Sequence, residues 1–463
     1  MVLVTRRRGL ALLVSMALSA TGAPWPAASA ALSVPGPIVR TLQLDSSNQA
    51  AWWKPVDEVG GSTYVAFDEH VPPTADAPPQ TYHRVVIGHA LGDGGWETGC
   101  VKDPSAPDGC ARFVDDCGHN QPTVVVDGDG FVHAFVSMHN ATWHYYRSAE
   151  PGSVTDMVDR SREMPHQAGR FTYPVATRTP NGDVYLIIRG TVDGSPSNGR
   201  LYRWSNETNT WSSVLTFASQ VKHWVYPDDL VADAQGDLHI LYEWSYGGAR
   251  AVRHLGSYLR YSPTTGLLSN LRGDVLQAPV TTAAKAVYQP LEQGETATGG
   301  AVNTAAGIQS AKLAIVPGTS TPMIAYRYRR ETSGPFEVRR ARPYGTGWRR
   351  EVVYAGRYDT FAAIDITHSG DTVRIYYAKK NHLTRDQAFV AEKGQVGDFA
   401  EISVAPGRTV ERLAVTMAPD GTDHLYLSDL ADAPRDKVDP RRSEDPPCLG
   451  GAPGVLLTST LPR

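Results

Sequence analysis

The sequence predicts an all-β protein that forms a single-domain, seven-bladed β-propeller over residues 31–463. Three observations lead to this prediction. One phrase, a turn of Asp, Asn or Gly followed by a strand of alternating apolar and aromatic residues, occurs seven times. Most copies follow one another at intervals of about 50 residues, and no segment keeps a helical period for more than two turns. Units of this length with several short strands are typical of propeller blades.

The copies of the phrase run in order along the chain as GGSTYVAFDE (60–69), DGDGFVHAFVSM (127–138), TPNGDVYLIIRG (179–190), DAQGDLHILYEW (233–244), PGTSTPMIAYRY (317–328), HSGDTVRIYYAK (368–379) and APDGTDHLYLSD (418–429). The wider gap between the fourth and fifth copies contains residues 281–309, which we expect to be an insertion. The first strand of the mature chain and GVLLTSTL (454–461) could close the ring together. A β-sandwich array is the alternative, but its units would run nearer about 100 residues with Greek-key spacing.

Residues 1–30 have the pattern of a secretory signal peptide, with an Arg triplet, a short apolar stretch and a small-residue Ala-Ser-Ala ending. We expect cleavage near Ala30 and a secreted protein that does not enter the membrane. Without the three Arg residues of this segment, the net charge changes from -4 to -7. This balance disfavours a nucleic-acid partner, because binding that polymer requires a basic face. We expect a monomer.

The four cysteines stand at 100, 110, 117 and 448, and their spacing fits no zinc pattern. Export to an oxidising compartment makes two disulfides the expectation. We favour one short bridge among Cys100, Cys110 and Cys117, with the remaining cysteine paired to Cys448. The sequence does not decide among these pairings.

His-Asn pairs stand at both ends of the second repeat, in DDCGHNQPTVVVDGDGFVHAFVSMHN (115–140). In a regular hairpin, His119 and His139 would lie at the same open end, opposite the DGDG turn. The third repeat has the same layout, with Tyr173 before its first strand and Arg189 at the end of its second. Equivalent ends of neighbouring blades meet near the central channel, so we expect these four side chains to form one site.

These residue types suit β-elimination across a uronic acid. That reaction requires a group that neutralises the carboxylate, a base for the adjacent carbon-bound proton, and a proton donor for the leaving glycosidic oxygen. Arg binds a carboxylate in bidentate geometry, neutral His is a base near pH 7, and Tyr can donate or relay a proton. Hydrolysis of a glycoside would instead require a facing pair of carboxyl groups.

The segments GHNQPTVVVDGDGFVHAFVSMHN, FTYPVATRT…YLIIRG and YPDDLVADAQGDLHILYEW resemble the BNR-repeat family, which includes secreted seven-bladed polysaccharide lyases of the ulvan lyase and rhamnose–glucuronate lyase types. The resemblance implies that His119 and His139 match the catalytic histidines of the family, Tyr173 its catalytic tyrosine and Arg189 its carboxylate-neutralising arginine. It also implies an acidic polysaccharide as substrate. The DDCG lead-in to His119 and the 281–309 insertion depart from the family, and they bear on which sugar is recognised. Which histidine is the base depends on the epimer of the uronic acid.

Further residues are candidates for substrate contact, namely Asn120, Asn140, His223, Tyr226, Arg253 and His254. Turn-forming Asn is the commoner explanation for the two asparagines. Trp52 and Trp53 could stack on sugar rings, although the core of the blades is the commoner place for Trp. The DGDG turn lacks the spaced carboxylates of an EF-hand loop. The sequence therefore indicates no required cofactor, and it leaves a structural calcium ion open.

Two other functions fit a propeller of this family. One is a glycoside hydrolase of the α-L-rhamnosidase type, because the wider family includes such an enzyme with its site on the opposite face. A sialidase is disfavoured, since no complete S-x-D-x-G-x-x-W box is present. The other is a non-catalytic propeller that binds glycans, in which the His, Tyr and Arg set would be accidental.

Overall fold

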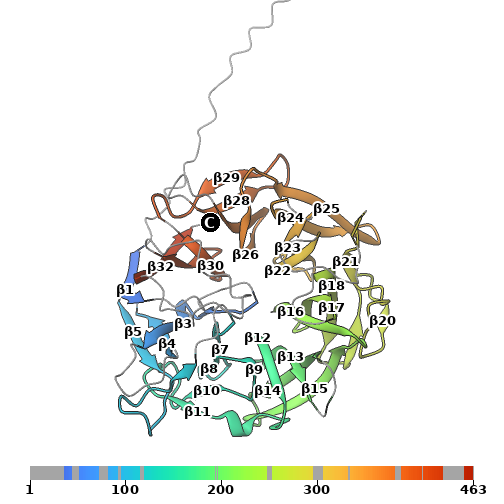
Figure 1. Cartoon of the computed structure of the whole chain (residues 1–463). Coiled ribbons are helices and arrows are strands. Elements are labelled where there is room, and N and C mark those ends of the chain that lie inside the picture. Colours follow the sequence, from blue (N-terminus) through green and yellow to red (C-terminus); the bar gives the residue numbers. More distant parts are fainter. Residues whose placement is uncertain are drawn as a thin grey trace, which may run out of the picture. The chain divides into compact units, whose positions relative to one another are not determined.

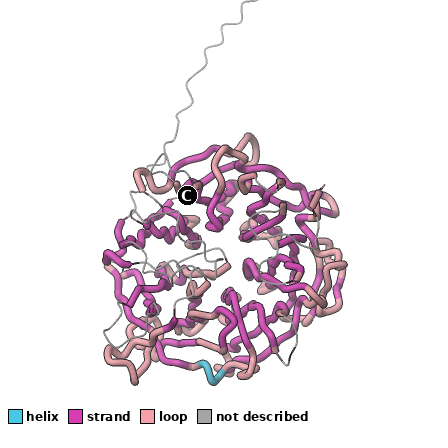
Figure 2. The backbone as a smooth tube through the Cα atoms, in the orientation of Figure 1, coloured by secondary structure: helices cyan, strands magenta, loops and turns pink. Residues whose placement is uncertain are grey.

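The structure is a computed structural model that describes residues 36–43, 52–71, 82–91, 95–114, 119–192, 194, 197–247, 253–292, 294–295, 306–331, 334–380, 387–408, 410–430 and 453–461. The described residues belong to one compact unit, Leu32–Arg463. The expected signal peptide, residues 1–30, lies outside them. Strands make up nearly all the regular structure of these residues (Figure 2), with one short helical turn, η1 (Ser161–Glu163).

The strands form successive antiparallel sheets in chain order (Figure 1). The first sheet contains β2 (Val56–Val59), β3 (Ser62–Val71), β4 (Tyr82–Ala90) and β5 (Trp96–Cys100), with β6 (Phe113–Val114) beside β4. The second contains β7 (Thr123–Val126), β8 (Val132–Phe135), β10 (Tyr145–Ser148) and β11 (Met157–Asp159). The third contains β12 (Arg170–Arg178), β13 (Val184–Thr191), β14 (Asn198–Ser205) and β15 (Thr210–Ala218), with β9 (His139–Ala141) beside β12.

The fourth and fifth groups share one sheet only through the single residue pair Arg253–Ile308. The fourth group contains β16 (His223–Ala232), β17 (Leu238–Tyr246), β18 (Arg253–Ser262), β19 (Leu267–Ser269), β20 (Val275–Leu276) and β21 (Val287–Gln289). The fifth contains β22 (Gly307–Ile315), β23 (Pro322–Arg329), β24 (Glu337–Tyr344) and β25 (Gly347–Tyr354). The sixth contains β26 (Thr360–Ser369), β27 (Thr372–Lys379), β28 (Ala388–Lys393) and β29 (Ala400–Ser403). The last contains β30 (Val410–Met417), β31 (Asp423–Leu430), β32 (Pro453–Leu461) and β1 (Gly36–Gln43).

These seven groups are the blades of a propeller, which confirms the predicted fold class. Their first strands contact one another in a closed cycle, from β2 through β7, β12, β16, β22, β26 and β30 back to β2. Each pair of neighbouring blades buries its own hydrophobic cluster, and a cluster between the first and last blades completes the cycle. The apolar residues that alternate along each strand therefore pack between blades, and both faces of every sheet are covered.

The predicted phrase proves to be the inner hairpin of every blade, since all seven copies span the turn between a first and a second strand. The last blade combines the two ends of the unit, because β1 pairs antiparallel with β32 in the sheet of β30 and β31. This pairing confirms the expected closure. It joins strands from opposite ends of the sequence, so opening the ring requires the loss of a whole strand from a sheet.

Carboxylates on three first strands also tie neighbouring blades together. In each case one carboxylate oxygen accepts the backbone N–H of the next first strand, in the pairs Asp57–Val126 (2.9 Å), Asp229–Leu313 (2.8 Å) and Asp365–Val415 (2.7 Å). These contacts hold the inner strands, and so the residues at their ends, in register.

Two buried Asp–His–Tyr sets resemble catalytic triads but belong to the blades themselves. His133 lies 3.0 Å from a carboxylate oxygen of Asp127 and 2.8 Å from the hydroxyl of Tyr145, and all three side chains are inaccessible to solvent. His239 makes the same pair of contacts two blades further along, with Asp233 and Tyr258. Burial lowers the pKa of His133, although Asp127 opposes this effect. A repeat of this kind indicates a structural link between the inner turn and the third strand.

The expected insertion at 281–309 is only partly separate from the blades. Residues 287–289 form β21 beside β18, and residues 307–309 begin β22, the first strand of the fifth blade. The predicted insertion was therefore wrong for residues 287–289 and 307–309, because both segments pair with strands of the blades. No helix among the described residues is long and apolar enough to cross a membrane.

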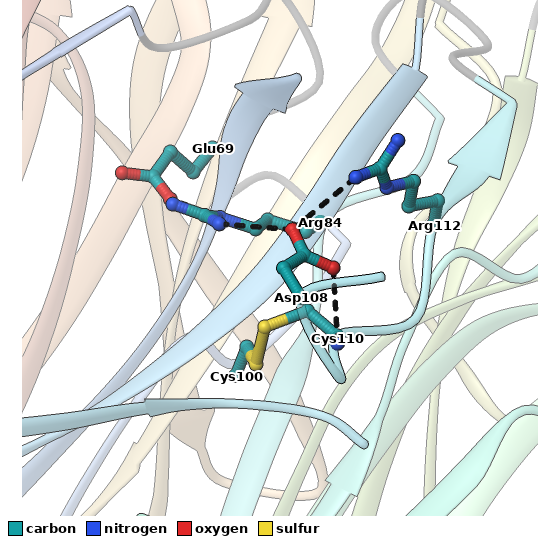
Figure 3. The surroundings of a disulfide bond; sticks show 6 residues. All are labelled: Glu69, Arg84, Cys100, Asp108, Cys110 and Arg112. Atoms are coloured by element: carbon teal, nitrogen blue, oxygen red, sulfur yellow. Dashed lines mark hydrogen bonds and ion pairs between the residues drawn. A yellow bond between two sulfur atoms is a disulfide. The ribbon is translucent and has the colours of Figure 1, made fainter. Parts of the chain in front are cut away.

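One disulfide joins Cys100 and Cys110, which confirms a short bridge in the early part of the chain (Figure 3). Cys117 and Cys448, the rest of the predicted pairing, lie outside the described residues. The bridge closes a loop that is also paired with both flanking blades, since Val101 N–H donates to Val85 O and Lys102 N–H donates to Met157 O. The loop is therefore a fixed wall between the first two blades.

Candidate active site

The two predicted histidines meet at one end of the second blade. His119 precedes β7 and His139 begins β9, while the turn between β7 and β8 lies at the other end of the hairpin. Their imidazole rings are stacked, with centroids 4.2 Å apart and planes inclined by 11°. This confirms that they share one open end.

His139 is positioned by the neighbouring blade. β9 leaves its own blade and pairs with β12, which places His139 opposite Thr172. The backbone N–H of Asn140 donates to the Thr172 hydroxyl at 2.8 Å, and Asn140 adopts a left-handed φ of 53°. Asn tolerates this conformation better than most residues. The second His-Asn pair therefore turns the chain across the boundary between blades.

The prediction that Tyr173 precedes the first strand of its hairpin was wrong, because Tyr173 lies inside β12. The register of β12 against β13 shifts between Thr172 and Val175, and Tyr173 sits in this bulge with a φ of 61°. A positive φ is strained for a tyrosine, and bulges commonly redirect a side chain. The ring is buried, with its centroid 6.4 Å from that of His139. The backbone thus directs Tyr173 toward the histidine pair at an energetic cost.

Arg189 lies in β13 opposite Thr172, directly beside this bulge. Its guanidinium carbon is 4.7 Å from the ring centroid of Tyr173, 4.6 Å from that of Tyr226 and 5.2 Å from that of Trp224. The side chain is only 5% exposed, and its Nη1 makes no hydrogen bond to any residue that the structure describes. A buried cation surrounded by aromatic faces retains the capacity to bind an anion.

A second buried arginine also packs against the ring of Tyr226. The Arg253 guanidinium carbon is 4.1 Å from the Tyr226 ring and 4.4 Å from the Trp52 ring. Its Nε lies 3.7 Å from a carboxylate oxygen of Glu243, which is fully buried. Burial raises the pKa of both Glu243 and the neighbouring Asp228, and the charge of Glu243 raises the pKa of Asp228 further. These acids face Arg253 from within the protein, so they do not form a solvent-facing carboxyl pair.

Trp52 and Trp53 are buried beside Tyr173 and Tyr226, in agreement with a core position as the commoner place for Trp. The two indoles pack with Tyr173 and Tyr226 in one buried cluster, at 5.5 and 5.2 Å from the Tyr173 ring centroid. Trp53 is held by its carbonyl oxygen, which accepts a hydrogen bond from Lys312 at 3.1 Å. The only sequence signal was a Trp pair just before the first blade.

The structure brings some of the other predicted residues to this cluster and holds the rest elsewhere. Tyr226 and Arg253 belong to it. Asn120 is buried and donates to the carbonyl of Val114, His254 is bonded to Glu295 at 2.6 Å, and His223 packs on Trp244 and Tyr246. Asn140 is exposed beside His139. The contacts of His254 Nδ1 with Glu295 and of Asn120 Nδ2 with Val114 hold these two side chains outside the cluster. No group of three or more metal-ligating side chains occurs in the part of the chain that the structure describes.

The fold and this geometry define a class of protein: a β-propeller with a recessed site of stacked histidines, aromatic rings and buried arginines at the ends of its inner strands. Residues 62–350 match the family described as "BNR repeat-containing family member". The chain belongs to this family, which confirms the resemblance seen in the sequence.

Two curated relatives are similar to part of the chain. They are the "Ulvan Lyase-PL25" of Pseudoalteromonas sp. (strain PLSV), 24% identical over 258 residues, and the "Ulvan lyase" of Alteromonas sp. (strain LOR), 24% identical over 197 residues. The first alignment covers 48% of this chain and 48% of the relative, and the second covers 35% and 39%. The chain thus spans less than half the length of the curated relatives it matches.

Solved structures match over more of the chain. A structure described as "a new family of Polysaccharide lyase PL25-Ulvanlyase" has a TM-score of 0.60 at 17% identity, covering 84% of this chain and 92% of its own. A further structure of that lyase, bound to -[GlcA(1-4)Rha3S]-, has a TM-score of 0.60 at 16% identity, with the same coverage. The "polysaccharide lyase Uly1" has a TM-score of 0.62 at 13% identity, covering 93% and 99%. At these identities the likeness shows the propeller fold.

Proposed function

We propose that this protein is a polysaccharide lyase that cleaves a uronic-acid-containing polysaccharide, of glucuronate or iduronate type, by β-elimination. One observation carries the proposal: His119, His139, Tyr173 and Arg189 converge from two neighbouring blades. The curated relatives named as ulvan lyases support the reaction class, and the GlcA in the ligand of the related structure supports a uronate.

Arg189 would bind the uronate carboxylate. Its guanidinium is held between aromatic rings with Nη1 available, and a bidentate Arg–carboxylate contact fixes both charge and orientation. Neutralising the carboxylate favours loss of the proton on C5, because the negative charge that develops beside it is then stabilised. Arg253, which also packs against Tyr226, supplies additional positive charge.

The histidine pair and Tyr173 would carry the proton transfers. One imidazole accepts the C5 proton, the C4–O bond breaks as the C4=C5 double bond forms, and the glycosidic oxygen leaves with a proton. His119 and Tyr173 take these two transfers in our proposal, and His139 acts as a second base or orients its partner through the stacked contact. The epimer of the uronate at C5 decides from which side the proton leaves, and so which side chain is the base.

Hydrolysis fits this site less well. A glycoside hydrolase of the usual kind requires two carboxyl groups that flank the scissile bond. The carboxyl groups of Asp228 and Glu243, which interact with Arg253, are 0% exposed and lie behind it. The elimination proposal needs no pair of carboxyl groups, whereas hydrolysis would require such a pair, and Asp228 and Glu243 are both fully buried beside Arg253.

The experiment is to incubate the full-length protein with ulvan, glucuronan and gum arabic and to follow the ultraviolet absorbance of a conjugated, unsaturated uronate. Absorbance that appears with the wild type and is lost in His119→Ala supports the lyase. Reducing ends without absorbance would establish a hydrolase, and binding without any product would establish a non-catalytic module. We further propose that the protein acts outside the cell, as the Cys100–Cys110 disulfide favours.

A further inference from the structure

A cavity of about 710 Å³ opens next to the histidine pair, and Arg189 is not among the residues that line it. His139, Asn120 and Ser137 line its inner end, and the disulfide-closed loop lines its outer wall. This volume lies within the usual range of ligand pockets. Since His139 borders both the cavity and the catalytic cluster, a sugar in the cavity would be the direct neighbour of the uronate in the proposed function.

The charges that line this cavity cancel, apart from His139 itself. Two cations, Lys102 and Arg112, stand against two carboxylates, Asp103 and Asp159. Arg112 is also bonded at 3.3 Å to Asp108, which lies between Arg112 and Arg84 at the disulfide (Figure 3). The cavity therefore presents no net positive charge to a ligand.

Asp103 and Asp159, the two carboxylates that line the cavity, are both held in place by hydrogen bonds that they accept. Asp103 accepts hydrogen bonds from the backbone N–H and the hydroxyl of Ser105, and these bonds lower its pKa. Asp159 accepts the backbone N–H of Ser161 at 2.8 Å. A sulfate ester or a second carboxylate placed here would face these acids, which offset the attraction of Lys102 and Arg112 for an anion.

One wall of the cavity is aromatic. Phe113 lines it and is braced by the rings of His144 at 5.1 Å and Tyr146 at 6.5 Å, both of which also line it. Burial lowers the pKa of His144, so this ring is uncharged at neutral pH. A flat apolar face with a few polar groups around it suits the C–H face and hydroxyls of a sugar.

We infer that this cavity is a subsite for an uncharged sugar next to the uronate, and that it discriminates against a sulfated one. The inference rests on the proposed function, and it adds that two neighbouring sugars of the substrate bind to different parts of the site. The carboxylate of one sugar is bound by the arginines of the third and fourth blades. The hydroxyls and apolar face of the next sugar are bound between Phe113, Asp103 of the disulfide-closed loop and Asp159 at the end of β11.

The test compares ulvan with the same ulvan after chemical desulfation, using the full-length protein. Because Asp103 and Asp159 balance Lys102 and Arg112, a sulfate ester would lose its hydration in the cavity without gaining a net positive partner. We expect kcat/KM to be at least about tenfold higher on the desulfated polymer, mostly through KM, which corresponds to about 1.4 kcal/mol. The variant Asp103→Asn/Asp159→Asn should reduce this preference by lowering KM for the sulfated polymer. The matched control, Asp274→Asn/Asp420→Asn, makes the same change of net charge at exposed sites on other blades and should leave the preference unchanged.

Equal or better cleavage of the sulfated polymer by the wild type would overturn the inference. So would a preference that both double variants reduce alike, since the effect would then come from net charge. If neither polymer is cleaved, the proposed function fails by itself, and the inference is then decided by calorimetric binding of the same two polymers. Tighter binding of the desulfated polymer supports it, and equal or weaker binding contradicts it. Phe113→Leu, which keeps an apolar side chain, should weaken binding of the desulfated polymer severalfold.

Discussion

Replacing Arg189 with alanine removes the group that we assign to the uronate carboxylate. The side chain is 5% exposed and its guanidinium lies within 4.6–5.2 Å of three aromatic ring centroids, so little water competes for it. A hydrogen-bonded charge pair in such a site contributes about 2–4 kcal/mol when one partner is removed. This range corresponds to a loss of roughly 30- to 1,000-fold in kcat/KM.

The assay measures kcat/KM from the absorbance of the unsaturated product, on a uronate polymer and on its methyl ester. The ester lacks the negative charge, so Arg189→Ala should lose far more on the free acid than on the ester. Arg189→Lys keeps the charge but not the bidentate geometry, and its kcat/KM on the free acid should lie between those of the wild type and Arg189→Ala. Arg203→Ala, on the same blade with its side chain 41% exposed and paired with Asp183, is the matched control and should keep full activity.

The reasoning would be refuted if Arg189→Ala, folded with an unchanged Tm, kept a kcat/KM within about threefold of the wild type on the free acid. Arg189 would then stabilise the transition state by less than about 0.7 kcal/mol. It would be refuted equally by the same loss on acid and ester, because the arginine would then act on something other than the carboxylate.

Other predictions concern the remaining groups. His119→Ala and Tyr173→Phe should each lower kcat by about 100- to 10,000-fold with little change in KM, as expected for proton transfer; a change confined to KM would assign them to binding. Cys100→Ser/Cys110→Ser opens a bridge between residues ten apart and should lower the free energy of unfolding by about 2–3 kcal/mol, measured in urea; an unchanged midpoint would speak against the loop as a fixed wall. Burial raises the pKa of Asp365 from 3.8 to about 7, so the folded protein binds more protons than the unfolded chain between these values. The free energy of unfolding should therefore fall as pH rises through this window, and less so in Asp365→Asn; the exposed Asp371→Asn should keep the slope of the wild type, and equal slopes in all three would contradict the prediction.

The blades could be predicted because their signal is local. Each inner hairpin has its own turn residues and its own alternation of apolar residues, so the seven copies in sequence became seven inner hairpins in the structure. The pairing of His119 with His139 was also local, since both flank one hairpin. Arg189 and Tyr173 followed from the equivalent layout of the next hairpin.

The remaining features depend on contacts that close only in the ring. Trp52 and Trp53 reach Tyr173 because the first and third blades both face the channel, and no short-range pattern encodes that approach. The bulge that turns Tyr173 toward His139 depends on the bonds of its neighbours, such as the Thr123 hydroxyl to the Pro174 carbonyl at 2.7 Å. His254 was misplaced for the same reason, because its partner Glu295 lies 41 residues away in the predicted insertion.

The central claim is that the cluster of His119, His139, Tyr173 and Arg189 performs an elimination. The most direct measurement is to digest a uronate polysaccharide in water labelled with a heavy oxygen isotope and to analyse the products by mass spectrometry. Elimination breaks the C4–O bond without adding water, so we predict unlabelled products that carry an unsaturated uronate, none of which form with His119→Ala. Heavy oxygen in the newly formed ends, without an unsaturated uronate, would contradict the account.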